Sequence, residues 1–330
     1  MTKTMQAIRV HRYGGPEELN LERIPRPEPK IGELLVRVHA AGVLPIETAV
    51  RQGRFPGVMP EAFPYIPGTA FAGVIEELGP AVTGWQVGEA VCGRSPNGTY
   101  AEYTTLLAEA PAAAPNTAGF RLSAAIIPLA RKPASLSFDE AATLSGGATT
   151  AWTALFADGD LQPGQRILIH GAAGGVGLFA VQFARWKGAH VIGTASTANV
   201  DFVRSLGADE VIDYTTTPFE EVAHNLDFVL DTIGGDTLLR SMPLVKRGGT
   251  VVSIVQPPPT ALAEALGVQA FKNAVLPASE HLRSIVQLID EGHVRPVIRR
   301  IFALYEAAQA HKLSETGHGR GRIVLHIADG

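Results

Sequence analysis

The stretch from Ile167 to Thr197, ILIHGAAGGVGLFAVQFARWKGAHVIGTAST, places a cluster of glycines between two apolar segments. Four of the seven residues from 171 to 177 are glycine, which is costly inside a helix and common in tight turns. Residues 166–171 are typical of a buried strand, 178–188 have helical spacing that ends at a glycine, and 190–194 are typical of a second strand. The pattern predicts a strand, turn, helix and strand. Polar residues interrupt it, which argues against a membrane span.

The glycine turn has a composition that suits anion binding. Glycines at 174, 175 and 177 let the backbone approach a ligand closely, and the following helix presents free N–H groups and its positive dipole end. Tight turns also use glycine for packing alone, but the position between a strand and a helix favours a dinucleotide pyrophosphate. We therefore predict that Gly174, Gly175, Val176 and Gly177 bind a cofactor.

Further strands follow this unit at regular spacing. Residues 207–214, 226–235 and 248–255 each contain an apolar, β-branched run, and the segments between them are long enough for crossover helices. This alternation predicts an α/β fold, with a doubly wound parallel Rossmann sheet over residues 139–277.

The rest of the chain has a different pattern. Residues 1–138 contain short strands broken by Gly and Pro with few helical segments, which predicts a mostly β domain. Residues 278–330 contain a helix and a closing strand, which we expect to return to that first domain. The segment 108–119, AEAPAAAPNTAG, is biased toward Ala and Pro and is expected to be an exposed loop.

Composition excludes several kinds of partner. The net charge is −4 and no run of Lys and Arg is present, so nucleic acid is not the expected partner. The chain has one cysteine, Cys92, so neither an intrachain disulfide nor a thiolate cluster for a metal is expected. The N-terminal residues lack a long apolar run, which favours a cytoplasmic protein without a membrane anchor.

Several separate segments occur in an order that resembles a known family. They are GTAFAGVIEELGPAVTGWQVGEAVCG, GTYAEY, TTAW, GAAGGVG, LGADEVIDY and GRIVL. Together they resemble the zinc-independent quinone oxidoreductase branch of the medium-chain dehydrogenase/reductase superfamily, over nearly the whole chain. The resemblance implies a GroES-like mostly β domain beside the Rossmann domain. It also implies hydride transfer from NADPH to a quinone or to the activated double bond of an enal or enone.

The residues after the second strand of the βαβ unit bear on the choice of nucleotide. An NAD site places Asp or Glu about 20 residues beyond the first glycine, whereas a 2′-phosphate needs neutral or basic neighbours. The segment TASTAN contains no acid, and Ser196, Thr197 and Asn199 can donate to a phosphate. Asp201 is the one nearby acid, and it is explained as a first-turn residue that favours the helix dipole. We predict NADPH; the alternative is a polar loop with Asn199 as a helix N-cap.

The resemblance implies further cofactor residues. Thr150 matches a threonine at the nicotinamide end, Tyr214 matches a tyrosine near the adenosine, and Arg320 lies in a tail that folds back toward the cofactor. Thr232 and Ile254 follow strands whose carboxyl ends face the cleft. An aromatic residue closing a strand end explains Tyr214 equally well, and a surface charge explains Arg320 equally well.

The positions that hold catalytic zinc in relatives lack ligands here. Leu44 stands in place of the cysteine, and Thr69 and Ala70 stand in place of the His-Glu pair, so no metal is predicted. The zinc-free branch has Asn-Pro-x-Asp where this chain has LPIE, so an amide is lost at Leu44 while Glu47 keeps an acid. Without a Lewis acid, quinones and activated alkenes are favoured over plain ketones, because they delocalise the incoming charge themselves.

Catalytic candidates are fewer than cofactor candidates. Tyr65 and Tyr100 can donate a proton or orient a carbonyl, although a hydrogen-bonded core tyrosine is the commoner case. Two functions therefore stay open. The first is an NADPH-dependent reductase of quinones or α,β-unsaturated carbonyls. The second is a non-catalytic dinucleotide-binding protein, of the kind that some relatives became as lens or RNA-binding proteins.

Residues 250–256, TVVSIVQ, form an apolar strand late in the sheet, and three prolines follow them. Relatives pair such edge strands between subunits, and an unpaired apolar edge invites a partner. The sequence therefore predicts a homodimer.

Overall fold

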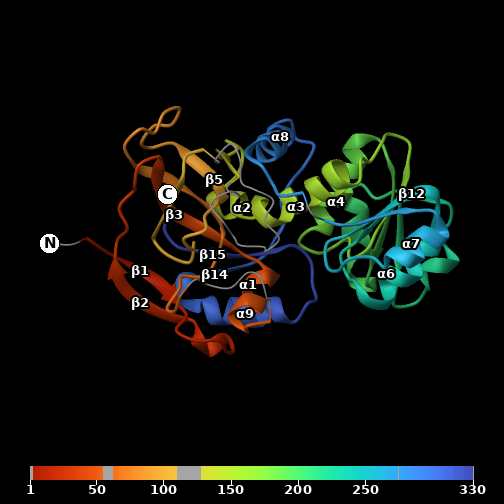
Figure 1. Ribbon diagram of the computed structural model, residues 1–330, viewed down its shortest axis with the longest axis horizontal. Coiled ribbons are helices and arrows are strands. Elements are labelled where there is room, and N and C mark those ends of the chain that lie inside the picture. The colour runs from red at the N-terminus through yellow and green to blue at the C-terminus, as the bar shows by residue number, and fades with distance from the viewer. Residues whose placement is uncertain (1–2, 55–61, 110–127, 274, 330) are drawn as a thin grey trace.

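The computed structural model describes residues 3–54, 62–109, 128–273 and 275–329, which form two lobes lying side by side (Figure 1). One lobe is built mainly of strands, and the other is a sheet covered by helices. In the described part of the chain, no helix combines the length and the apolar composition that a membrane span requires. Most of the expected loop 108–119 lies outside the described residues.

The strand-rich lobe contains a seven-stranded sheet and a two-stranded ribbon of β1 and β2. The larger sheet has the order β14-β15-β3-β4-β5-β7, with β6 also paired to β3, and its pairs are antiparallel except β14 with β15. The C-terminal strands β14 and β15 thus join the sheet that contains the N-terminal strand β3. The strands are β1 (Thr4–Arg9), β2 (Asn20–Pro25), β3 (Glu33–Val43), β4 (Ala70–Leu78), β5 (Ala90–Arg94), β6 (Tyr103–Leu107), β7 (Leu129–Arg131), β14 (Ile298–Ala303) and β15 (Arg322–His326).

Short helices cover this lobe. Helix α9 packs against α1 and β15, and α8 contacts β7 and α3 (Figure 1). Helix α8 buries residues at helical spacing, Leu282, Ile285 and Ile289, which is the pattern of an amphipathic helix. The helices are α1 (Pro45–Arg51), α2 (Phe138–Ala141), α8 (Ser279–Asp290) and α9 (Ala307–Glu315).

The second lobe is a six-stranded parallel sheet with the order β10-β9-β8-β11-β12-β13. The chain runs outward from β8 to β10, returns to β11 and then continues the other way to β13, so the strand order reverses beside β8. In such sheets ligands bind at the carboxyl ends of the strands around this point. The predicted fold class, a Rossmann sheet beside a GroES-like mostly β domain, is confirmed. The elements are α3 (Thr149–Trp152), β8 (Arg166–Ile169), α4 (Gly177–Lys187), β9 (His190–Ala195), α5 (Val200–Ser205), β10 (Glu210–Asp213), β11 (Leu226–Asp231), α6 (Gly235–Ser241), β12 (Val245–Ser253), α7 (Thr260–Leu266) and β13 (Gln269–Lys272).

The burial of helix α4 explains why residues 167–197 are so apolar. Its residues from Gly177 to Ala184 are all buried, and the apolar side chains among them belong to a core cluster shared with the sheet. The helix ends at Gly188, which has a φ of 85° and supplies the left-handed conformation of a helix C-cap. The hydrophobic composition therefore reflects burial inside the protein.

One core cluster spans both lobes. It includes Ala72 and Cys92 from the strand-rich sheet together with Ile169 and Phe179 from the Rossmann lobe. Burial raises the pKa of the Cys92 thiol to about 12, so this cysteine is a neutral core residue.

The expectation that residues 250–256 form the edge of the sheet is wrong. Strand β12 lies between β11 and β13, and β13 is the edge strand. After the three prolines the chain forms α7 and returns as a four-residue strand that covers β12. Strand β13 is short and mostly exposed, so its sequence does not carry the apolar run of the inner strands.

Candidate functional site

Residues predicted to bind the cofactor follow the carboxyl ends of five neighbouring strands. The glycine turn follows β8, Ser196 follows β9, Tyr214 follows β10, Thr232 follows β11 and Ile254 follows β12. Because these strands are parallel, their carboxyl ends meet at one edge of the sheet. The sheet topology thus brings together residues that are far apart in the sequence.

Three consecutive backbone N–H groups of the glycine turn make no hydrogen bond to the described residues. Gly174 N–H donates to the Gly171 carbonyl at 2.9 Å, and Leu178 N–H donates to the Gly174 carbonyl at 3.0 Å. Between them, the N–H groups of residues 175–177 have no acceptor in the described part of the chain. A Cβ on Gly177 would overlap the Gly171 carbonyl oxygen, so the turn needs glycine there. Three adjacent free N–H groups at the start of a helix form an anion site.

Arg322 lies against this turn and was not predicted from the sequence. Its side chain is 4% exposed, and a Cβ on Gly175 would lie 2.7 Å from its Nη1. Its Nε and Nη2 are buried without a hydrogen-bond partner among the described residues. The neighbouring Gly321 N–H donates to the Ala173 carbonyl at 3.0 Å, which fixes the strand start against the turn. Burial lowers the pKa of Arg322 to about 10, so the guanidinium is charged at neutral pH.

Arg320 lies elsewhere, on the outside of the same tail. It is exposed, and its guanidinium carbon lies 5.3 Å from the centroid of the Phe202 ring in α5. It forms no ion pair with the described residues. Helix α5 directly follows the Ser196–Asn199 turn, so Arg320 lies against the helix that begins at that turn.

The polar turn after β9 has an internal hydrogen bond. Asn199 stands at the N-cap position of α5, but its side chain makes no capping bond and its Nδ2 donates to Ser196 Oγ at 3.0 Å. Asn199 is therefore the N-cap residue by position, as the alternative interpretation expected, but its side chain does not cap the helix. Since Ser196 Oγ accepts this bond, its own hydrogen is free for a ligand.

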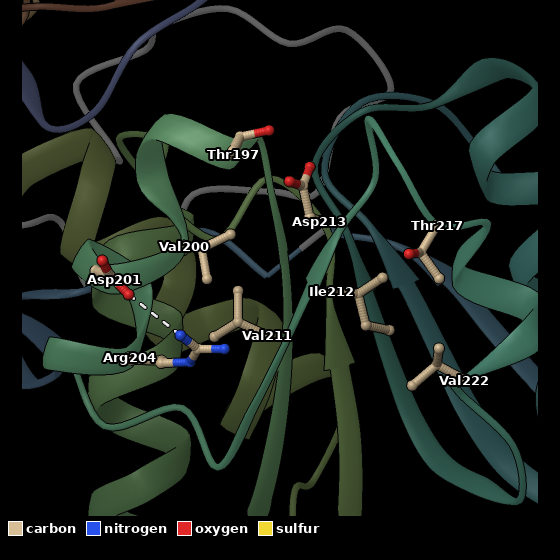
Figure 2. A pocket seen from close by; sticks show the side chains of 9 residues that line it. All are labelled: Thr197, Val200, Asp201, Arg204, Val211, Ile212, Asp213, Thr217 and Val222. Carbon is tan, nitrogen blue, oxygen red and sulfur yellow. Dashed lines mark hydrogen bonds and ion pairs between the residues drawn. The ribbon is translucent and has the colours of Figure 1, made fainter.

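A pocket of about 440 Å³ begins beside this turn and follows the outer edge of β10 (Figure 2). Its charged pair is Asp201 with Arg204, at 3.1 Å. Asp213 lies at the end of the pocket nearest Thr197, so the expectation that Asp201 is the one acid near the turn is wrong. The parallel register places Asp213 opposite Ala195, immediately before the polar turn. The pocket is lined by Thr197, Val200, Asp201, Arg204, Val211, Ile212, Asp213, Thr217 and Val222.

The remaining predicted cofactor residues differ in exposure. Thr150 is half-buried and donates its hydroxyl to the Gly146 carbonyl at 3.0 Å. Thr232 donates to the His170 carbonyl at 2.8 Å and lies against Gly171, at the start of the turn. Tyr214 is 53% exposed and Ile254 is half-buried, so both have surface available to a ligand.

The two candidate catalytic tyrosines lie in different surroundings. Tyr100 is fully buried, and its hydroxyl donates to Glu47 Oε2 at 2.7 Å and lies 3.1 Å from His311 Nε2. Tyr65 is partly exposed, but its hydroxyl is buried without a partner among the described residues. Burial raises the pKa of both phenols, so both keep their protons at neutral pH.

Glu47 is the centre of a closed polar cluster in the strand-rich lobe. Its carboxylate also accepts from the Leu44 N–H and the Thr69 N–H, both at 2.9 Å. Burial raises the pKa of Glu47, and these hydrogen bonds oppose that shift. The Leu44 side chain itself packs against Gly146. Among the described residues, no group of three or more His, Cys, Asp or Glu is placed to hold a metal ion.

The fold, a Rossmann sheet beside a mostly β lobe, defines a class of proteins that bind dinucleotides. Residues 206–325 match the family model described as zinc-binding dehydrogenase, and residues 30–116 match that of the alcohol dehydrogenase GroES-like domain. The quinone oxidoreductase of Mus musculus is 33% identical over 98% of each chain. The chain therefore belongs to the medium-chain dehydrogenase/reductase superfamily.

Two further relatives agree with this assignment. The 2-methylene-furan-3-one reductase of Solanum lycopersicum is 30% identical over 98% of this chain and 79% of its own length. The solved structure of the quinone oxidoreductase from Coxiella burnetii superposes with a TM-score of 0.85 at 34% identity, covering 99% of this chain and 100% of the other.

Proposed function

We propose that the chain is an NADPH-dependent reductase of quinones or of activated C=C bonds in α,β-unsaturated carbonyl compounds, and that it works without zinc. The free N–H groups of residues 175–177, together with the unpartnered nitrogens of Arg322, carry this proposal. Buried donors without acceptors, such as those of Arg322, are rare in proteins, and a pyrophosphate would accept from both sets. The residues present therefore fit a nicotinamide dinucleotide.

Each part of the cofactor has a set of residues to hold it. We assign the pyrophosphate to residues 175–177 and Arg322, and the 2′-phosphate to Ser196 and Arg320. Ser196 has a free hydroxyl hydrogen, and Arg320 has an exposed guanidinium beside α5. When bound, the nicotinamide supplies the hydride, and we expect Thr150 to lie near that end.

The residues around the acceptor favour a substrate that stabilises its own charge. Leu44, Thr69 and Ala70 offer no catalytic zinc site, so we assign the chain an acceptor with a built-in electron sink. A hydride added to the β-carbon of an enone moves the electron pair onto the carbonyl oxygen, and a proton then completes the reduction. We propose Tyr65 as its donor before Tyr100, because the Tyr100 hydroxyl is already bonded to Glu47.

Oxidation of NADPH with a panel of 2-alkenals, enones, quinones and simple ketones tests this function. We expect turnover with the first three classes, poor turnover with ketones, and unchanged rates in a chelator. Stoichiometric zinc whose removal abolishes activity would contradict the zinc-free mechanism. If no acceptor supports NADPH oxidation, the non-catalytic dinucleotide-binding function replaces the reductase.

Replacement of Ser196 by Asp tests the phosphate site. A carboxylate beside the 2′-phosphate should lower the efficiency with NADPH about tenfold more than with NADH, a difference of about 1.4 kcal/mol. Ser205→Asp, at the far end of α5, adds the same charge and serves as the control. An NADPH to NADH ratio that Ser196→Asp leaves unchanged would show that the phosphate binds elsewhere.

We also propose that the chain is a cytoplasmic homodimer whose partners are small molecules and not nucleic acid. The edge strand β13 is the surface that supports a dimer, because it offers unpaired backbone groups and a Phe271 side chain that is 39% exposed. Light scattering at micromolar concentration should give twice the mass of the chain. The mass of a single chain would refute the dimer.

A further inference from the structure

A chain of hydroxyl groups connects the turn after β9 to an acid at the end of β10. Thr197 Oγ1 lies 2.9 Å from Thr215 Oγ1, and Thr215 donates its hydroxyl to Asp213 Oδ1 at 2.6 Å. The Thr215 N–H donates to the same carboxylate oxygen at 3.0 Å. Figure 2 shows Thr197 and Asp213 at the same end of the pocket, with their oxygen atoms turned toward each other.

The hydrogen bonds between these hydroxyl groups can be donated in only one direction. A threonine hydroxyl has a single hydrogen, and that of Thr215 is used by Asp213, so Thr197 must be the donor toward Thr215. The hydrogen of Thr197 is thus directed at the Asp213 side, and its lone pairs are the part left for a ligand. A ribose hydroxyl can donate to those lone pairs, whereas a phosphate, which only accepts, cannot use them.

The negative charge of Asp213 also favours a ribose hydroxyl over a phosphate at this position. The Thr197 hydroxyl, whose hydrogen is directed at the Asp213 side, and the Thr215 hydroxyl and N–H lower the pKa of Asp213, which keeps it ionised at neutral pH. Arg204, the cation of the pocket, is paired with Asp201 at 3.1 Å. A carboxylate with no cationic partner among the described residues therefore lies beside Thr197, in the turn that begins at Ser196.

We propose that Asp213 is a specificity-determining residue that limits the preference for NADPH over NADH, acting through Thr215 and Thr197. The inference rests on the proposed function for the position of the nucleotide ribose. In this arrangement Ser196 and Arg320 favour the phosphate, while Asp213 with Thr197 favours the free ribose hydroxyl. The chain therefore accepts both nucleotides, and Asp213 sets how far NADPH is preferred.

Direct binding of NADPH and NADH to the full chain, measured by nucleotide fluorescence without an acceptor, tests this proposal. Asp213→Asn should raise the affinity for NADPH relative to NADH by about tenfold, because like-charge repulsion is removed. Asp201→Asn makes the same change in the same pocket, at a carboxylate already paired with Arg204, and should shift the ratio less than twofold. Thr197→Val should weaken NADH binding more than NADPH binding.

The salt dependence gives a second readout. Exposed charges are screened within about 10 Å at 0.1 M salt, so added salt should raise the NADPH preference of the wild type more than that of Asp213→Asn. If both nucleotides bind but Asp213→Asn leaves their ratio unchanged, the inference is overturned and the proposed function is not. A ratio that shifts in a protein that reduces no acceptor would support the inference and overturn the reductase. Absence of binding by either nucleotide would overturn both.

Discussion

Two buried charged groups, Glu47 and Arg322, lie in contrasting surroundings. The Glu47 carboxylate accepts from two backbone N–H groups, the Thr69 hydroxyl and the Tyr100 hydroxyl. The Arg322 guanidinium lies against the glycine turn, with Nε and Nη2 unpartnered among the described residues. Glu47 has hydrogen bonds from the protein to both carboxylate oxygens, whereas Arg322 has buried donors without hydrogen-bond acceptors among the described residues, which is uncommon for a buried group.

This difference separates structural groups from ligand-binding groups. A buried charge with a full set of donors holds neighbouring segments together, in this case α1 and the segments before β4 and before β6. The donors of Arg322 have no hydrogen-bond partner among the described residues, and Coulombic attraction to Glu47 offsets its burial only in part, so an anion that accepts from these donors should stabilise it. The contrast therefore predicts that changes at Glu47 act on folding and changes near Arg322 act on binding.

The largest effect is expected at the glycine turn. Gly175→Val would place side-chain carbons where Arg322 lies and close the backbone approach, so affinity for both nucleotides should fall more than a hundredfold. Gly174→Ala is the matched control, because its added carbon would lie 3.2 Å from the Gly171 carbonyl oxygen, and it should cost less than tenfold. Calorimetric titration measures both. Wild-type affinity for both nucleotides in Gly175→Val would show that the glycine turn does not bind the cofactor.

A smaller effect on binding and a larger one on stability are expected in the closed cluster. Tyr100→Phe removes a donor from buried Glu47 and should lower the free energy of unfolding by about 1–3 kcal/mol, with nucleotide affinity unchanged. Tyr65→Phe removes a hydroxyl that has no partner in the described residues, so it should be neutral or slightly stabilising. Urea unfolding compares the two. A destabilised Tyr65→Phe beside an unaffected Tyr100→Phe would reverse our interpretation of both residues.

The pH dependence sharpens the contrast further. His170 is buried below the glycine turn, 2.7 Å from Ser241 Oγ through Nε2 and 3.2 Å from Thr194 Oγ1 through Nδ1, and burial lowers its pKa to about 4. Between pH 6.5 and 4, the unfolded chain therefore binds a proton at His170 that the native state does not bind. The contribution of neutral His170 to the free energy of unfolding is complete above pH 6.5 and is lost as the pH falls toward 4. The loss should be about 1.4 kcal/mol per pH unit.

His170→Gln, which has no titrating ring, should show a shallower loss of stability over the same range. Urea unfolding at pH 7, 6 and 5 provides the comparison. Equal slopes for the wild type and the variant would show that His170 is not neutral in the native state.

The βαβ unit, the sheet and the glycine turn followed from the sequence because local patterns determine them. Residues 166–195 show strand and helix periods in succession, and the glycines mark the turn between them. The short edge strand β13 did not follow, because a strand of four mostly exposed residues leaves no apolar run to detect.

Arg322 and Asp213 were missed for a different reason. Arg320 and Arg322 are two positions apart, which would place them on one face of a regular strand, but Gly321 has a φ of 80° and breaks that alternation. Arg320 therefore faces solvent while Arg322 is buried. Asp213 reaches the polar turn only through the pairing of β10 with β9, which is a contact between segments distant in the sequence. Its position at the end of a predicted strand was the available signal.

Titration calorimetry of NADPH and NADH with Arg322→Met and Arg320→Met tests the central claim most directly. Arg322→Met removes the buried donors of the pyrophosphate site, so both nucleotides should bind about thirtyfold more weakly, a loss of about 2 kcal/mol, while the empty protein should be no less stable. Arg320→Met should weaken NADPH alone. Wild-type affinity for both nucleotides in Arg322→Met would show that the unpartnered guanidinium is not a cofactor ligand. It would also contradict the distinction between Glu47 as a structural group and Arg322 as a ligand-binding group.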